Sequence, residues 1–171
     1  MSVWSRPLSA AALAVGMLAP LSALQAQTAG EVIKTATHPE HGVYLTDGAG
    51  YALYLFEEDR PEGERGRPVE SDCLDECLGR WPPFSPDALP EAEGEADASL
   101  LASFERPDGG TQLTYNGWPL YYFVEDFGPG DTNGHDFEEF GGEWYLLTPA
   151  GHALGEDLDD DKRNREDDES G

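Results

Sequence analysis

Two short stretches of the chain carry aromatic or aliphatic residues at nearly every position. The first is "YALYLF" at residues 51–56, and the second is "PLYYFV" at residues 119–124. Successive side chains of a strand point to opposite faces, so apolar residues at both alternating positions predict strands that are covered on both sides. In the first strand, Tyr54 and Phe56 are expected on one face, and Leu53 and Leu55 on the other.

Both stretches belong to copies of one longer pattern. Residues 47–59 ("DGAGYALYLFEED") align without a gap on residues 114–126 ("TYNGWPLYYFVED"). The identical pairs are Gly50 and Gly117, Leu53 and Leu120, Tyr54 and Tyr121, Phe56 and Phe123, Glu58 and Glu125, and Asp59 and Asp126. We interpret the pattern as an internal duplication of a turn, a strand and an aspartate at the strand exit.

Turn and breaker residues indicate where the other elements lie. Asn116-Gly117 separates two apolar runs and is a strong signal for a two-residue hairpin. Further strands are predicted at residues 43–46, 101–105 and 143–148. A short helix is predicted between Cys73 and Arg80, because the two prolines of the following "WPPF" cannot continue it.

These elements predict a mainly β fold, with one short helix near the cysteines. The expected architecture is a compact antiparallel sandwich or a barrel-like domain built from two related β units. The predicted segments are a signal peptide (1–26), an N-terminal segment (27–42), a first repeat unit (43–85), an acidic loop or linker (86–99), a second repeat unit (100–155) and a disordered acidic tail (156–171).

The first 26 residues have the composition of an export signal. Arg6 precedes a mostly apolar run, and small residues recur up to Ala26. Pro20 interrupts a run that is already short for a membrane span, so no stable membrane insertion is expected after cleavage. The expected location is the periplasm or the extracellular medium.

Acidic residues dominate the composition. The 171-residue chain has 35 aspartates and glutamates against 10 lysines and arginines, which gives a net charge of −25. Nucleic acid is excluded as a partner, because binding phosphates requires a basic surface. Solubility in a salty medium is the simplest role for this charge, and cation capture is the alternative.

The duplicated motif and its surroundings resemble a bacterial family of secreted repeats of unknown function. Relatives of this family are often described as predicted lipoproteins with a Y-x-(F/W/Y)-x-x-D motif. The matching residues are Tyr54, Phe56 and Asp59 in the first unit, and Tyr121, Phe123 and Asp126 in the second. The segments "CLDECLGRWPPF", "PGDTNG" and "GGEWYLL" are also similar to the family pattern. This chain lacks the lipid-acceptor cysteine of many relatives, and the family implies no established activity.

The motif residues are expected to be scaffolding. Their rings would pack in the core, and each aspartate would accept hydrogen bonds from backbone N–H groups or from a tyrosine hydroxyl. The alternative is that Asp59 and Asp126 form a catalytic carboxylate pair. Such a pair needs unlike environments beside one substrate, whereas duplication favours like environments. We therefore predict no catalytic residues and no enzymatic activity.

Cys73 and Cys77 are the only cysteines. In an exported protein a local disulfide is the expected state, which would fix the segment that carries Trp81. A redox-active dithiol is the alternative, although the neighbouring acidic residues disfavour a reactive thiolate. A metal site is another, in which the two sulfurs would be joined by one or more of the histidines, His38, His41, His135 and His152.

Two histidines also lie close together in "THPEHG". His38 and His41 could bind copper or zinc weakly, but a solvated turn is the preferred interpretation. No metal and no cofactor are therefore predicted.

Tryptophans and tyrosines leave one further option. Core packing is the expected role of these rings, and a surface formed by Trp81 and Trp118 that binds a glycan or a peptide is the alternative. The predicted function is a non-catalytic binding or envelope-associated module, with a cell-envelope component, a glycan or a peptide as partner. The alternative is a redox or metal-handling accessory protein that uses Cys73 and Cys77.

Overall fold

The computed structural model describes Met1, residues 31–63 and residues 67–155. The described elements are, in chain order, β1 (Val32–His38), β2 (Gly42–Asp47), β3 (Tyr54–Phe56), α1 (Glu76–Arg80), β4 (Glu91–Ala92), a 3₁₀ turn (Ala98–Leu100), β5 (Leu101–Glu105), β6 (Thr111–Tyr115), β7 (Trp118–Pro119), β8 (Phe137–Glu139) and β9 (Gly142–Leu146). The predicted signal peptide, apart from Met1, and the predicted tail lie outside the described residues.

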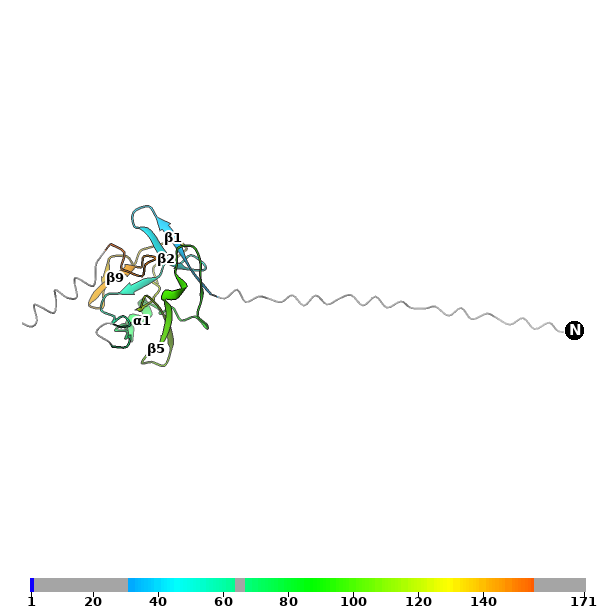
Figure 1. Cartoon of the computed structure of the whole chain (residues 1–171), viewed down its shortest axis with the longest axis horizontal. Helices are drawn as coiled ribbons and strands as arrows, with labels where there is room; N and C mark the ends of the chain where they lie inside the picture. Colours follow the sequence, from blue (N-terminus) through cyan, green and yellow to red (C-terminus); the bar gives the residue numbers. More distant parts are fainter. Residues whose placement is uncertain (2–30, 64–66, 156–171) are drawn as a thin grey trace, which may run out of the picture.

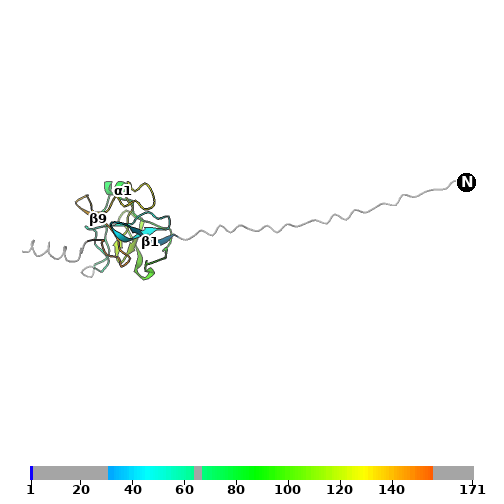
Figure 2. The ribbon, with the colours of Figure 1, turned by 90° about the horizontal axis from the view of Figure 1, so that it is seen from above.

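The described strands form three small sheets. Their strand orders are β2-β1-β4, β3-β9-β8 and β5-β6-β7, and every pairing is antiparallel except that of β1 with β4. Figure 1 shows the β1–β2 hairpin at one end of the body and β5 at the opposite end, and Figure 2 shows α1 at its margin. The mainly β prediction is confirmed, and the described strands do not close into a barrel.

Several predicted elements are confirmed in place. The helix forms at α1, and strands form at residues 42–47, 101–105 and 142–146. The hairpin between β6 and β7 pairs Tyr115 with Trp118 around Asn116-Gly117. Asn116 has φ 50° and Gly117 has φ 84°, which suits a turn whose two central residues both need positive φ.

Two segments contain strands that the sequence did not predict. The N-terminal segment contributes β1, a full strand of seven residues. The acidic stretch at residues 86–99, predicted as a loop or linker, contains β4, which pairs in parallel with β1. Glu91 of β4 is exposed and only the small side chain of Ala92 packs against the core, so backbone pairing contributes most to holding this strand in the sheet.

Strand β3 separates two groups of buried side chains, as its pattern predicted. Leu53 and Leu55 lie in one core cluster, with Leu45, Leu113, Leu120 and Tyr145 among its members. Tyr54 and Phe56 lie in the other, which also contains Trp81, Tyr121, Phe123 and Trp144. Both repeat units contribute to each cluster, and β3 of the first unit pairs with β9 of the second. The two units therefore share both clusters and have no separate cores.

Candidate functional site

The two copies of the motif meet at the backbones of Tyr54 and Tyr121. The N–H of each residue donates to the carbonyl of the other, and both N···O distances are 3.0 Å. In this antiparallel bridge the two copies make the same contact through the same motif position. In each copy the aspartate N–H closes an equivalent turn, from Asp59 to Phe56 O and from Asp126 to Phe123 O, both at 3.1 Å. Only the first copy has a strand before this turn, because β7 ends at Pro119 and the strand predicted at residues 119–124 is reduced to isolated bridges at Tyr121.

The motif side chains then cross from one unit to the other. The hydroxyl of Tyr54 donates to the Asp126 carboxylate at 2.7 Å, and the hydroxyl of Tyr121 donates to Asp59 at 2.7 Å. We call these contacts the reciprocal tyrosine–aspartate pairs. Burial raises the pKa of both tyrosines, so each hydroxyl keeps its proton and remains a donor.

The two aspartates nevertheless lie in different environments. Asp59 is fully buried, with an exposed fraction of 0%, while Asp126 is only partly buried. Burial raises the pKa of Asp59 to about 7, against the lowering effect of hydrogen bonds from Tyr121 and from the N–H of Asp72. Burial also raises the pKa of Asp126, where the bond from Tyr54 lowers it. Duplication has therefore not given the two carboxylates like environments.

A buried polar network continues from Asp59. Ser71 Oγ lies 2.7 Å from the Tyr121 hydroxyl oxygen and accepts from Arg106 Nη1 at 3.0 Å. The same Arg106 guanidinium donates to Gln112 Oε1 and to the carbonyl of Cys73, the latter at 2.7 Å. A buried Arg needs such partners, because an unpaired charge in the core is costly.

Ser71, Arg106 and Gln112 were not among the residues predicted to form a site. Gln112 carried a usable signal, because it stands in the strand "TQLTY" of a chain whose strands are covered on both faces. A polar side chain in such a strand needs a buried partner. Ser71 and Arg106 come from loops distant in sequence, and no local pattern relates them to Gln112.

The difference between the pairs predicts unequal costs for two equivalent substitutions. Tyr121→Phe should lower the free energy of unfolding by about 2–3 kcal/mol, because Asp59 and Ser71 lose a buried partner. Tyr54→Phe should cost about 1 kcal/mol, since water can reach Asp126. Urea unfolding of both variants measures the difference. Equal costs would show that burial of the Asp59 side does not control the energy of the pair.

The two cysteines form the predicted disulfide. Cys73 and Cys77 are bonded with their Cα atoms 5.3 Å apart, and their exposed fractions are 0% and 3%. Both belong to the cluster that contains Trp81. The alternative roles of this pair, as a dithiol or as metal ligands, need accessible thiols, and the bonded and buried sulfurs do not provide them.

Trp81 and Trp118 do not form an exposed binding surface. Their exposed fractions are 0% and 6%. Trp81 stacks on Trp144 with ring centroids 3.8 Å apart and on Phe123 at 4.2 Å, and its indole N–H donates to Glu139 at 3.1 Å. Both rings therefore pack in the core, as expected by default, and the alternative of an exposed platform at these two residues is wrong.

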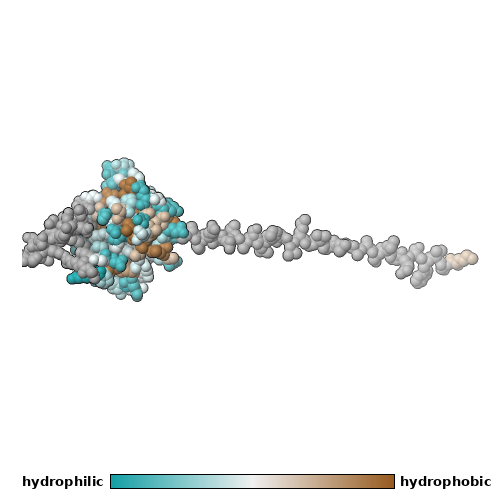
Figure 3. Space-filling model, in the orientation of Figure 1, coloured by the Kyte–Doolittle hydropathy of each residue, from teal (hydrophilic) through white to brown (hydrophobic). Residues whose placement is uncertain are grey.

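A cleft opens beside Asp126 instead. It has a volume of about 230 Å³ and is lined mainly by Tyr51, Pro82, Tyr122, Phe123, Val124 and Asp126. The Tyr122 hydroxyl donates to Asp47 at 3.0 Å, which fixes one wall. The site thus combines aromatic and aliphatic walls with one carboxylate. Apolar residues are interspersed with hydrophilic ones on the face of the molecule in Figure 3.

Comparison with known proteins gives one match. A family model described as "Secreted repeat of unknown function" matches residues 35–85 and 102–148, close to the two predicted units. No curated protein and no solved structure is significantly similar to the chain. Among the described residues, none of the helices has the length and apolar character that crossing a membrane requires. With two matched repeats that together cover more than half of its length, the chain belongs to the family of secreted repeats of unknown function.

Proposed function

We propose that this protein is a non-catalytic module, acting in the periplasm or outside the cell, that binds a cationic peptide segment of an envelope protein. A lysine or arginine side chain of the peptide enters the cleft, where its charge meets Asp126 and its methylene groups contact Phe123 and Tyr122. The observation that carries the proposal is the difference between the two motif aspartates. Asp59 is sealed in the core, whereas Asp126 lines a cleft.

The size and composition of the cleft support a ligand of this kind. Pockets for drug-sized ligands have volumes of ~300–1,000 Å³. At about 230 Å³ the cleft suits one long side chain better than a complete small molecule. Its aromatic walls can stack on a guanidinium or cover the methylene groups of a lysine.

Charge supports the same choice. The net charge of −25 attracts cationic partners over long distances and increases their rate of encounter. A neutral glycan, the other ligand class considered, would gain nothing from this field. The other motif aspartate, Asp59, is sealed in the core, so the two motif carboxylates cannot act as an acid–base pair on one substrate, which supports a non-catalytic role.

Peptide binding provides the test. Short peptides with one central arginine or lysine between apolar residues are titrated against the protein by calorimetry, with glutamate at the same position as the reference peptide. Asp126→Asn should weaken binding of the basic peptides about tenfold or more, which corresponds to about 1.4 kcal/mol. Asparagine keeps one acceptor for Tyr54, and the N–H of Asn133, which now donates to the other oxygen of Asp126, is exposed and can donate to water, so the fold should be retained.

A matched variant distinguishes binding in the cleft from attraction by the net negative charge of the protein. Glu95→Gln removes one charge from an exposed residue that does not line the cleft. If both variants weaken binding equally, the field of the whole protein explains the affinity and the cleft has no role. Binding of the glutamate peptide as tight as that of the basic peptides would also contradict the proposal.

A further inference from the structure

The hairpin between β1 and β2 presents three residues with metal-binding side chains on one tight turn. His38 pairs with Gly42 across the hairpin, so the connecting loop is Pro39, Glu40 and His41. Gly42, the strand residue directly after the loop, has φ 86°, a left-handed backbone conformation that glycine adopts without strain. Pro39 restricts the backbone at the start of the loop. The turn therefore holds His38, Glu40 and His41 close together on a rigid support.

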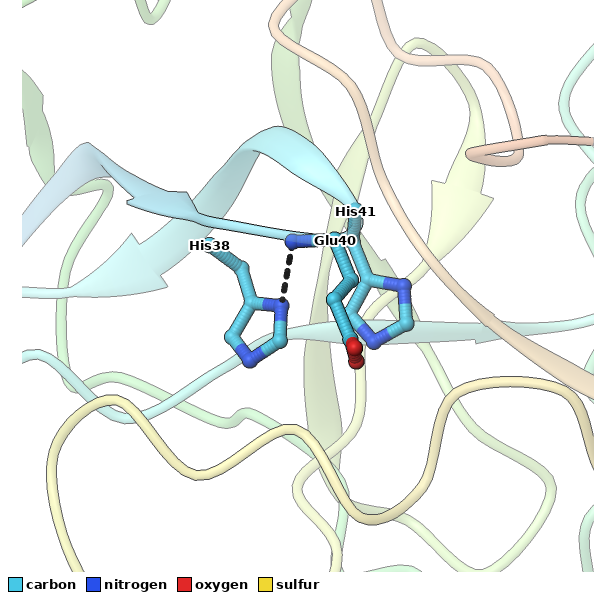
Figure 4. A group of neighbouring side chains, drawn as sticks. All are labelled: His38, Glu40 and His41. Carbon is cyan, nitrogen blue, oxygen red and sulfur yellow. Dashed lines mark hydrogen bonds between the residues drawn. The ribbon is translucent and has the colours of Figure 1, made fainter.

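The side chains of this turn converge. One donor atom of each of the three residues lies within 4.8 Å of the others. Figure 4 shows the Glu40 carboxylate beside the His41 ring and the His38 ring on the same side of the hairpin. The two imidazoles stack with centroids 4.5 Å apart. Both histidines are partly exposed and Glu40 is exposed, so an ion can reach them from solvent.

A third histidine from a distant segment supports the arrangement. The ring of His135 packs edge-on against His41, with centroids 4.5 Å apart. Its side chain is 4% exposed and its Nδ1 lies 3.5 Å from the carboxylate of Asp136. His135 thus limits the rotation of His41 and acts as a positioning residue.

We propose that His38, Glu40 and His41 form a binding site for a divalent transition metal ion of the zinc class. Imidazole nitrogen and carboxylate oxygen are donors that Zn²⁺ prefers, with bonds of ~2.0–2.2 Å. Donor atoms around one such ion lie about 3–4 Å apart. The two imidazoles stack with an interplanar angle of 20°, so their rings must turn toward a common ion to close the site. Three protein donors leave a fourth position for water or for a ligand from another molecule, which suits reversible uptake and transfer.

Binding has one local cost. The N–H of Glu40 donates to Nδ1 of His38 at 3.2 Å. A metal on Nδ1 takes the lone pair that accepts this bond, and a metal on Nε2 leaves the ring proton on Nδ1, so the hydrogen bond is lost in either case. The bond is exposed, so water can take its place. The site shares no residue with the cleft at Asp126, and the two proposals stand independently.

The test is a titration of the purified protein with Zn²⁺ near neutral pH by calorimetry. An excess of Mg²⁺ is present throughout, because it occupies sites made only of carboxylates. We expect one saturable Zn²⁺ site per chain. His38→Ala and His41→Ala should each weaken binding about tenfold or more, and Glu40→Gln should weaken it less.

Two comparisons decide the outcome. His152→Ala removes a histidine outside the cluster and should leave Zn²⁺ affinity unchanged. Unchanged melting temperatures without metal establish that the variants fold. The proposal is overturned if Zn²⁺ does not bind in excess Mg²⁺, if the double variant of His38 and His41 retains the affinity, or if His152→Ala weakens binding as much as His41→Ala.

Discussion

The free energy of unfolding should fall by about 4 kcal/mol as the pH rises from 3.8 to about 7, through the titration of Asp59 alone. In the unfolded chain this carboxyl releases its proton near its ordinary pKa, whereas burial keeps it protonated in the folded protein until about pH 7. Between these values the folded state binds one more proton than the unfolded state. Each unit of pH therefore costs about 1.4 kcal/mol, and the loss is complete above the folded pKa.

Asp59→Asn isolates this contribution. The asparagine is neutral at all pH values and retains an acceptor and a donor for the neighbouring groups. Urea unfolding from about pH 5 to about pH 8 should show the variant gaining stability relative to the wild type as the pH rises. Protonation of the many surface acids affects both proteins equally, so it cancels in the comparison.

Glu95→Gln is the matched control, because it changes an exposed carboxyl instead of a buried one. Its difference from the wild type should stay nearly constant over the same range. A constant difference for Asp59→Asn as well would mean that Asp59 is ionised in the folded protein throughout.

Trp81→Ala should lower the free energy of unfolding by about 3–5 kcal/mol, the cost of deleting a large buried aromatic side chain. The ring has no exposed surface and lies between Trp144 and Phe123. The space it would leave cannot be filled by one neighbouring side chain. Since domains are stable by only ~5–15 kcal/mol, the variant should be partly unfolded at physiological temperature.

Phe127→Ala is the control for Trp81→Ala, because it also replaces an aromatic residue by alanine but does so at the surface. Phe127 is 84% exposed, so its removal should change stability by less than about 0.5 kcal/mol. Thermal unfolding followed by circular dichroism measures both variants. Retention of full stability by Trp81→Ala would contradict the packing described for the aromatic cluster.

Local patterns predicted the parts of the fold that depend on neighbours in sequence. Alternation around Tyr54 identified the two faces of β3, and Asn116-Gly117 identified a hairpin because only a few residue types tolerate its backbone. The disulfide followed from two cysteines one helical turn apart. In each case the physical constraint acts within a few residues.

Features that depend on distant segments were missed or wrong. Strand β4 has little apolar surface, and only its pairing with β1 explains its conformation. The stacking partners of Trp81, Trp144 and Phe123, come from the second unit, so no pattern near Trp81 could identify them. The difference between Asp59 and Asp126 has the same origin, since Arg106 and Ser71 lie beside only one of the two.

The crossing of the tyrosine–aspartate contacts has a consequence for the history of the chain. Each tyrosine hydroxyl donates to the aspartate of the other unit, so one unit by itself would leave both its tyrosine and its aspartate without this contact. One unit also supplies only part of the shared aromatic cluster. Two identical units related by twofold symmetry would satisfy both contacts at once. An ancestor with a single unit would therefore have needed to form a homodimer, and gene fusion of its two subunits would have freed Asp126 to diverge from Asp59.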